Sequence, residues 1–369
     1  MNKVVFVFLA VSLVLLSGCV QQQEEKIRVG GILPLTGNAA YYGNAARNGI
    51  EIARQAMEEK YPDLDIEVYY EDSFYTPKGG VDAYSKLANA DGIDAVITGA
   101  SQVSLAVQPL AKQDNVMQMA IFCSAEKYTS PDDLAFRVSN RNELEAKEAA
   151  AFIGKKGFER LAVIYLNNDF GVGFRDALLE ELEKQRVKAV VAGEEGVLLE
   201  AKDFRTVLSK LQQNNPDVIF MVGIASQYGL IMKQAREMGL ETQFLSMRSA
   251  EDPVLFENAG ETAEGLVYTY PFDSASKDSE IEKFSKAFIE AYGTVPDAYA
   301  AEGYEGFRVL AEAFGECGKN MQCAKNYLQG LKNFSSVFGS MGFDGNGDVN
   351  YGFFLKTVKD GKFVPCECG

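Results

Sequence analysis

The sequence of 369 residues contains no histidine. This absence excludes Ser-His-Asp and Cys-His nucleophile pairs, metal sites built on imidazole, and acid–base chemistry by a side chain that titrates near neutral pH. Any catalysis would have to rest on carboxylates, Lys, Tyr or Cys.

Positive charge is also scarce, because 36 Lys and Arg stand against 52 Asp and Glu, a formal net charge of −16 at pH 7. Such a surface repels a phosphate backbone, so nucleic acid is not an expected partner. The 47% hydrophobic and 24% charged residues are typical of a globular protein. At roughly 150 residues per domain, the length predicts two to three domains.

Long apolar runs are absent apart from residues 4–16, and this run is too short to span a bilayer. It follows Lys3 and has the features of a secretory signal peptide, which we predict over residues 1–18. The next residues, Leu16-Ser17-Gly18-Cys19, resemble the lipobox of prokaryotic lipoproteins. We therefore expect Cys19 to be lipidated, residues 19–26 to form a polar tether, and the remaining chain to lie outside the cytoplasm, anchored to the cell membrane.

Five cysteines remain after Cys19, and their odd number leaves at least one thiol unpaired within the chain. Outside the cytoplasm, Cys317 and Cys323 are close enough in sequence to close a small disulfide loop. For Cys366 and Cys368, in the C-terminal tail, we expect free thiols or a bridge to another molecule.

Enzyme and ion-binding motifs are incomplete. Ser124 and Lys127 have the serine β-lactamase spacing, but neither SDN nor KTG occurs, and no P-loop sequence occurs either. The stretch 344–348 (DGNGD) is similar to the start of a calcium loop, but Val349 and Leu355 stand where Gly and Glu are needed, so we expect a turn. We expect no catalytic residues, no cofactor and no metal ion.

From Ile27 onward, short β-branched runs alternate with longer amphipathic stretches, the pattern of an α/β fold with parallel sheets. The number of strands is too high for one small sheet, so we expect two doubly wound parallel-sheet lobes. Strands are predicted at 27–33, 66–70, 95–98, 116–122, 161–165, 189–191, 218–222, 243–246 and 266–270, and a closing hairpin from 352 that turns at 360–361. Helices are predicted at 44–60, 81–90, 105–112, 143–156, 174–185, 204–213, 228–238, 280–292 and 299–314.

In open parallel sheets, ligands bind beyond the carboxyl ends of the strands, where helix N-termini direct N–H groups into a crevice. The sequence places small hydroxyl side chains, backbone donors and one arginine at these positions, a set that suits a carboxylate. Ser101 or Ser226 taken alone is equally explained as a helix N-cap, and only the convergence of several strand ends favours a site. The candidate ligand-binding residues are Tyr42, Ser101, Gln102, Cys123, Ser124, Phe170, Ala225, Ser226 and Arg248.

Several segments resemble the solute-binding proteins of branched-chain amino acid ABC importers, which have the type I periplasmic-binding fold. They are residues 27–49 (IRVGGILPLTGNAAYYGNAARNG), 95–111, 161–173 (LAVIYLNNDFGVG), 217–239, 252–265 and 298–313. The resemblance implies two lobes joined by three crossings, near 137–140, 268–272 and 339–343. It places residues 27–138 and 271–340 in the first lobe, and residues 139–270 and 341–369 in the second.

The resemblance also implies roles for single residues. Ser101 and Ser124 match hydroxyl positions that hold the amino acid carboxylate, with Ser104 as a rival of Ser101. The backbone of Cys123 matches a carbonyl that faces the ammonium group. Tyr42 and Phe170 match aromatic walls of the pocket.

Arg248 departs from the family pattern, because many amino-acid-binding members have Glu or Asp there to pair with the ammonium group. A buried cation would repel that group. Two interpretations remain open: Glu251 takes the role, or the ligand lacks a free ammonium group and carries a second acid group. The tyrosine that other members have at position 225 is also missing, since this chain has alanine there.

The function that these observations favour is capture of an amino acid or a related small carboxylate for an ABC importer. The implied partners are a permease and its separate ATPase subunits, and we expect a monomer. The alternative is a sensory protein of the same fold that signals to a membrane receptor. Genes for a permease and ATPases beside this one would favour the importer.

Overall fold

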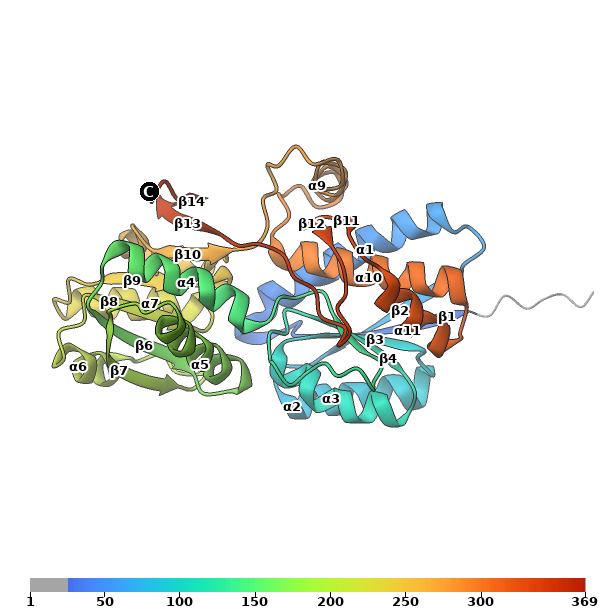
Figure 1. Cartoon of the computed structure of the whole chain (residues 1–369), viewed down its shortest axis with the longest axis horizontal. Helices are drawn as coiled ribbons and strands as arrows, with labels where there is room; N and C mark the ends of the chain where they lie inside the picture. The colour runs from blue at the N-terminus through green and yellow to red at the C-terminus, as the bar shows by residue number, and fades with distance from the viewer. Residues whose placement is uncertain (1–25, 369) are drawn as a thin grey trace, which may run out of the picture.

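The computed structural model describes residues 26–368. The predicted signal peptide and the lipidation of Cys19 lie outside these residues, as does the tether except for Lys26. The described chain folds around two separate β-sheets, each with helices on both faces, and the two bodies lie side by side (Figure 1). The predicted α/β class with two parallel-sheet lobes is confirmed.

The first lobe has a five-stranded parallel sheet in the order β2-β1-β3-β4-β5. The helices α1, α10 and α11 cover one face, and α2 and α3 cover the other (Figure 1). The strands are β1 (Ile27–Leu33), β2 (Ile66–Asp72), β3 (Ala95–Gly99), β4 (Met117–Ile121) and β5 (Ala135–Arg137). The helices are α1 (Ala40–Lys60), α2 (Pro77–Lys86), α3 (Ser101–Gln113), α9 (Ser279–Tyr292), α10 (Ala298–Cys317) and α11 (Met321–Gly330), with the small hairpin β11 (Phe334–Ser336) and β12 (Gly339–Met341).

The second lobe has a seven-stranded sheet in the order β14-β13-β10-β9-β8-β6-β7, in which only β13 and β14 run antiparallel to their neighbours. The strands are β6 (Arg160–Leu166), β7 (Val190–Val197), β8 (Val218–Val222), β9 (Gln243–Ser246), β10 (Val267–Tyr270), β13 (Phe354–Lys359) and β14 (Lys362–Pro365). The helices are α4 (Asn142–Lys156), α5 (Asp169–Lys184), α6 (Arg205–Gln212), α7 (Ala225–Glu237) and α8 (Val254–Ala259). Short helical turns at Leu87–Asp91, Gly37–Ala39, Arg248–Ala250 and Gly260–Ala263 complete the chain.

The central strand β8 explains why an unbroken apolar run forms the middle of a sheet. All five of its residues are buried, as expected for a parallel strand covered on both faces. Because side chains alternate along a strand, Phe220 packs in the core with Phe174 of α5, while Met221 packs in the opposite core with Tyr228 of α7.

The chain passes between the two lobes three times: after β5, after β10, and between β12 and β13 (Figure 1). Hydrogen bonds join the first passage to the third. The Asn140 amide donates to the Tyr351 carbonyl at 2.7 Å and accepts from the Tyr351 N–H at 3.0 Å. Arg137, which is fully buried, donates through Nε to Asp348 at 2.6 Å.

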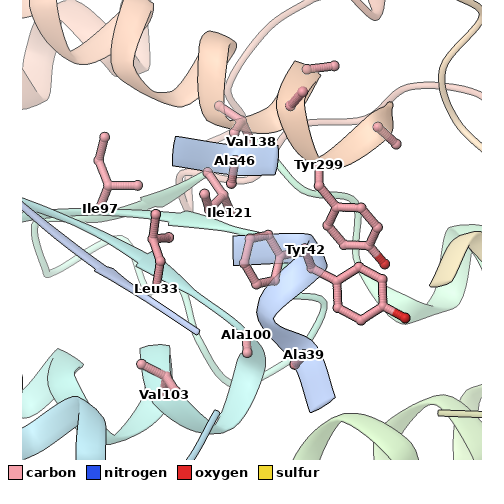
Figure 2. Packing of buried hydrophobic residues seen from close by; sticks show 14 of the residues in the cluster. Leu33, Ala39, Tyr42, Ala46, Ile97, Ala100, Val103, Ile121, Val138 and Tyr299 are labelled. Atoms are coloured by element: carbon pink, nitrogen blue, oxygen red, sulfur yellow. The ribbon is translucent and has the colours of Figure 1, made fainter. Parts of the chain in front are cut away.

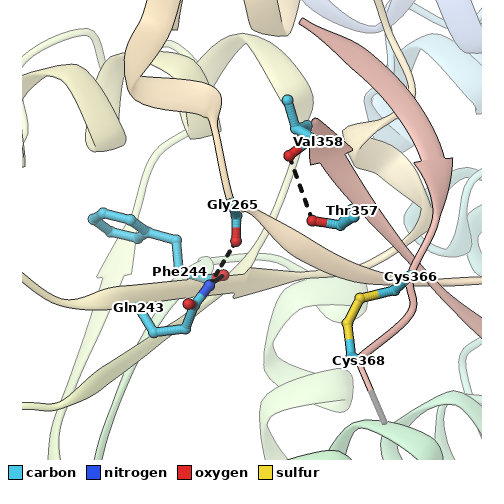
Figure 3. The surroundings of a disulfide bond; sticks show 7 residues. All are labelled: Gln243, Phe244, Gly265, Thr357, Val358, Cys366 and Cys368. Atoms are coloured by element: carbon cyan, nitrogen blue, oxygen red, sulfur yellow. Dashed lines mark hydrogen bonds between the residues drawn. A yellow bond between two sulfur atoms is a disulfide. The ribbon is translucent and has the colours of Figure 1, made fainter. Parts of the chain in front are cut away.

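Two disulfide bonds lie within residues 26–368. Cys317 and Cys323, which flank the start of α11, are joined, with their Cα atoms 5.6 Å apart. Cys366 and Cys368 are also joined, which corrects the expectation of free or externally bridged thiols (Figure 3). The Cys366 N–H donates to the Leu355 carbonyl at 2.9 Å, and this bond holds the tail against the hairpin that β13 and β14 form. Cys123 is a free, buried thiol.

Membrane-spanning helices are not found among the described residues: within residues 26–368, no helix has the length and apolar character needed to cross a membrane. The turn predicted at residues 344–348 is confirmed, because the Asp344 carboxylate accepts the N–H groups of Asn346 and Asp348 at 2.8 and 3.0 Å. In the same described residues, no cluster of three acidic or cysteine side chains is arranged to hold a metal ion.

Candidate ligand site between the lobes

A small cavity of about 30 Å³ lies between the two lobes. In this conformation it has room for only about two water molecules, so a larger ligand requires the lobes to part. Its lining comes from both lobes: Tyr42, Tyr75, Ser101, Phe122 and Tyr299 from the first, and Phe170, Gly223, Ile224, Met247, Arg248 and Ser249 from the second.

Strand ends supply most of this lining. Ser101 begins α3 directly after β3, and Phe170 lies in the first turn of α5 after β6. The N-terminus of α5 is capped by Asn168, whose side chain accepts the N–H of Gly171 at 2.9 Å. The site therefore lies where parallel sheets place ligands, at the carboxyl ends of their strands.

Three residues at or next to the cavity have a strained backbone conformation with positive φ. Tyr75 and Phe122 have φ of 58° and 36°, and Ala100, which precedes Ser101, has φ of 83°. Each such residue costs on the order of 1–3 kcal/mol and persists only where the surrounding structure holds it. Three such positions fix the directions in which Tyr75, Ser101 and Phe122 leave the backbone.

Tyr42 of α1 bridges the lobes through its hydroxyl group. The hydroxyl donates to the Ser249 carbonyl at 2.9 Å and accepts the Ala225 N–H at 3.0 Å, and both partners belong to the second lobe. The Tyr42 ring lies 4.5 Å, centroid to centroid, from that of Tyr299 on α10, and both hydroxyls point the same way (Figure 2). The Tyr42 hydroxyl therefore joins the two lobes by direct hydrogen bonds.

A buried ion pair also crosses between the lobes. The Nη1 of Arg248 binds Oε1 of Glu302, which lies on α10 and is fully buried. Burial is the largest single influence on the pKa of Arg248 and lowers it, but the charges of Glu302, Tyr299, Glu145 and Tyr351 together outweigh burial and raise the pKa. Arg248 also lies 5.7 Å from the centre of the Tyr299 ring. The guanidinium is therefore charged and held in place from the opposite lobe.

Glu302 is a fixed carboxylate at the centre of a network. Besides Arg248, it accepts hydrogen bonds from the Tyr351 hydroxyl at 2.9 Å, the Ser139 hydroxyl at 3.3 Å and the Phe122 N–H. Tyr351 and Ser139 belong to the passages between the lobes. The network thus connects the hinge region to Arg248 in the cavity wall.

Four of the nine sequence candidates line the cavity: Tyr42, Ser101, Phe170 and Arg248. The other five lie behind it or beside it. Gln102 donates to the Tyr75 carbonyl at 3.0 Å, the Ser124 N–H donates to Ser101 Oγ at 3.2 Å, and the Ser226 carbonyl accepts from Asn258 at 2.9 Å. The Ser124 hydroxyl is buried with no hydrogen-bond partner among the described residues. Ala225 meets the site only through its N–H bond to Tyr42.

Two groups expected to meet the charge of the ligand make other contacts in this structure. The Cys123 carbonyl, expected to face an ammonium group, accepts from Nη1 of Arg137 at 3.3 Å, because the buried guanidinium needs acceptors on that side. Glu251, one candidate partner for an ammonium group, binds Lys356 and accepts from the Tyr268 hydroxyl at 2.6 Å within the second lobe. The carboxylate beside Arg248 is Glu302, which the sequence reading did not single out.

Sequence reading also missed Tyr75, Phe122 and Tyr299. Tyr75 follows the end of β2 and Phe122 follows β4, so the position after a strand was the available signal for both. Tyr299 lies in the first turn of α10 and reaches the cavity only because α10 packs along α1. The local sequence around Tyr299 does not predict that contact.

A second, wider recess of about 750 Å³ lies between residues 125–127 of the first lobe and α5 of the second. A cation in its wall, Lys184, is already paired with Glu143 at 3.5 Å and with Glu180 at 3.0 Å. The inner cavity, where Arg248 faces inward, is therefore the better candidate site.

We predict that Tyr42→Phe opens the lobes. The substitution leaves the Ala225 N–H without its partner, and an unpaired donor of this kind costs the closed state about 1–3 kcal/mol. Apparent affinity for any ligand that binds the closed form should fall about 5- to 150-fold, and small-angle X-ray scattering should show a larger radius of gyration. Tyr292→Phe is the control, since that hydroxyl bonds only within the first lobe, to the Asn48 carbonyl at 3.4 Å. Equal behaviour of the two variants would contradict the bridging role of Tyr42.

The two-lobed α/β fold, with a cavity that both lobes line, is the architecture of a solute-binding protein. The chain belongs to the periplasmic binding protein family, whose family model matches residues 26–362. It is similar to the Leu/Ile/Val-binding protein homolog 2 of Brucella abortus, with 27% identity over 350 residues that cover 91% of this chain and 92% of that one. Proteins of this family bind solutes, and a non-enzymatic role follows at the level of the family.

Solved structures of solute-binding proteins have the same fold. A leucine-binding protein from Thermotoga maritima superposes with a TM-score of 0.82 at 25% identity, covering 92% of this chain and 97% of that one. A solute-binding protein of an ABC transporter from Rhodopseudomonas palustris, in complex with 3,4-dihydroxybenzoic acid, has a TM-score of 0.81 at 23% identity, covering 92% and 95% of the two chains. The second likeness supports the fold alone.

Proposed function

We propose that this chain is the extracytoplasmic substrate-binding lipoprotein of an ABC importer. It captures an amino acid or a related small carboxylate by closing its lobes and delivers it to the permease, which works with separate ATPase subunits. The observation that carries the proposal is the cavity itself, because both lobes line it and because Tyr42 and Glu302 of the first lobe bind groups of the second.

Closure of the lobes couples ligand binding to the conformation of the protein. A ligand touches both lobes only when they are shut, so it shifts the open–closed equilibrium by the difference between its affinities for the two states. We place the lobe boundaries at the three passages, with residues 27–138 and 271–340 in the first lobe and 139–270 and 341–369 in the second. The closed form is the state that a permease would recognise, and the protein acts as a monomer.

The names of relatives support a small carboxylate. The relatives are named for leucine, isoleucine and valine, and each of these amino acids carries a carboxylate. The predicted signal peptide and the predicted lipidation at Cys19 support anchoring at the outer face of a membrane.

A thermal-shift screen of the purified protein tests the proposal, with amino acids, dicarboxylates, aromatic acids and amides as the panel. A ligand that binds only the folded state raises the melting temperature in a concentration-dependent way. We expect one class of carboxylates to do so, to reduce the radius of gyration, and to be recovered chemically unchanged. Conversion of the ligand, or binding without compaction, would overturn the proposal.

A further inference from the structure

We propose that the ligand is a carboxylic acid that carries no ammonium group, with its carboxylate on Arg248 and an apolar body between aromatic rings. This inference rests on the proposed function and narrows its ligand class. It stands on the distribution of charge around the inner cavity.

Arg248 is the only charged side chain among the cavity-lining residues. The remaining lining consists of aromatic, aliphatic and hydroxyl side chains and a glycine. In the lining, a ligand that enters this cavity therefore meets one charged group, and that group is a guanidinium.

Two carboxylates, those of Glu302 and Glu145, lie close to Arg248, but neither lines the cavity. Glu302 is fully buried, and its two oxygens already accept from Arg248, Tyr351, Ser139 and Phe122. Glu145 of α4 accepts from the Thr269 hydroxyl at 2.6 Å and from the Arg248 N–H at 3.3 Å, and neither carboxylate lines the cavity. An ammonium group in the cavity would thus meet no carboxylate in the cavity wall and would lie beside a guanidinium.

The guanidinium keeps donors for a ligand. A guanidinium has five N–H groups, and Nη1 is the only side-chain nitrogen of Arg248 with a hydrogen-bond partner in residues 26–368. The planar arrangement of the remaining donors suits a carboxylate, which accepts two parallel hydrogen bonds. Glu302 fixes the guanidinium from the opposite lobe, so the donors are oriented before a ligand arrives.

The rest of the cavity favours an apolar body over a polar one. Five aromatic side chains line it: Tyr42, Tyr75, Phe122, Phe170 and Tyr299. Of the hydroxyl groups beside them, that of Ser249 is already engaged, since it donates to the Gly223 carbonyl at 2.7 Å and lies 2.9 Å from the Tyr228 hydroxyl. A second charged group on the ligand would find no partner of opposite sign.

Calorimetric titration of the purified protein with matched pairs tests this inference. L-leucine differs from 4-methylpentanoate, and L-phenylalanine from 3-phenylpropanoate, only by the ammonium group. Like charges in contact cost several kcal/mol, so we expect the acid of at least one pair to bind about 100-fold more tightly than its amino acid. An amino acid that binds as tightly as its acid overturns the inference but leaves the proposed function standing. Absence of binding by every carboxylate overturns both.

Substitutions at Arg248 test whether this residue binds the carboxylate of the ligand. Removing Arg248 alone would leave Glu302 buried without a cation, which threatens folding. The double variant Arg248→Met with Glu302→Gln removes both charges, and Arg248→Lys keeps the charge but loses the planar fork. We expect about 100-fold weaker acid binding in the first and about 10-fold in the second. Arg175→Met is the matched control, because Arg175 lies on α5 outside the inner cavity and binds Asp176 and Glu194. Unchanged acid affinity in a folded double variant overturns the role of Arg248.

Discussion

Asp348→Ala is expected to lower the free energy of unfolding by about 3–5 kcal/mol, measured by urea denaturation. Asp348 accepts from Nε of Arg137 at 2.6 Å and from the Thr129 hydroxyl at 2.5 Å. Removing its carboxylate leaves the fully buried guanidinium of Arg137 without a counter-charge. A buried charge that loses its partner costs far more than the intact pair contributes, and this asymmetry sets the size of the effect.

The same pair connects the hinge region to the site. Arg137 ends β5, and its Nη1 donates to the carbonyls of Cys123 and Ala125, at 3.3 and 2.7 Å. These residues follow Phe122, which lines the cavity. Loss of Asp348 therefore releases a guanidinium that supports one wall of the site as well as the first and third passages, and ligand affinity should fall together with stability.

Two comparisons isolate the buried charge. Asp82→Ala removes a carboxylate from an exposed pair with Lys78 and should change stability by at most about 1 kcal/mol. The double variant Arg137→Met with Asp348→Ala should be more stable than Asp348→Ala alone, because it leaves no unpaired charge. A loss below about 1 kcal/mol in Asp348→Ala, or a double variant less stable than the single one, would contradict this account.

The sequence predicted the sheets more accurately than the helix starts. Strands 27–33, 218–222 and 243–246 were placed to the residue, because β-branched and aromatic residues end abruptly there at polar or turn residues. Predicted starts for α1, α3 and α5 came four or five residues late, at 44, 105 and 174. The first turns of these helices consist largely of small, polar or glycine residues, which carry no apolar periodicity.

Short elements were missed for another reason. β5 has three residues, α8 has six, and β11 and β12 have three each. Segments this short have little periodicity to detect, and pairing with distant chain stabilises them. The closing hairpin was predicted correctly, since Asp360-Gly361 is a strong turn signal between two β-prone runs.

The candidate site was predictable where it follows strand ends and unpredictable where it depends on packing between distant helices. Ser101, Phe170 and Arg248 lie within four residues of the end of a strand, and all three line the cavity. Glu302 and Tyr299 lie on α10, 260 and 257 residues after Tyr42 in the sequence, and reach the site through the contact between α10 and α1. No local pattern encodes that contact.

Two glycines allow α1 and α10 to touch backbone to backbone. A Cβ atom at Gly49 of α1 would lie 1.9 Å from the Ala300 carbonyl oxygen, and one at Gly303 of α10 would lie 2.1 Å from the Ala46 carbonyl oxygen. Both distances are far inside van der Waals contact with backbone, which cannot rotate away as a side chain can. The helices can therefore pack this closely only while both positions lack a side chain.

Gly303→Ala should consequently destabilise the protein by about 3 kcal/mol, at the upper end of overpacking effects, although alanine is the better helix former. The added methyl group forces α10 away from α1. Tyr299 and Glu302 lie on α10 and Tyr42 lies on α1, so the separation also displaces the wall of the cavity. We expect about 10-fold weaker ligand binding in calorimetry, together with a lower midpoint of urea unfolding.

Gly330→Ala provides the matched control, because Gly330 ends α11 and a Cβ atom there would meet no atom within 4 Å. This control should leave ligand binding unchanged and leave stability unchanged or slightly higher. If Gly303→Ala behaves in the same way, the helices can separate at little cost, and the close crossing does not hold Tyr42, Tyr299 and Glu302 in position. A loss of both stability and affinity in Gly303→Ala alone ties the geometry of the site to a contact that only glycine permits.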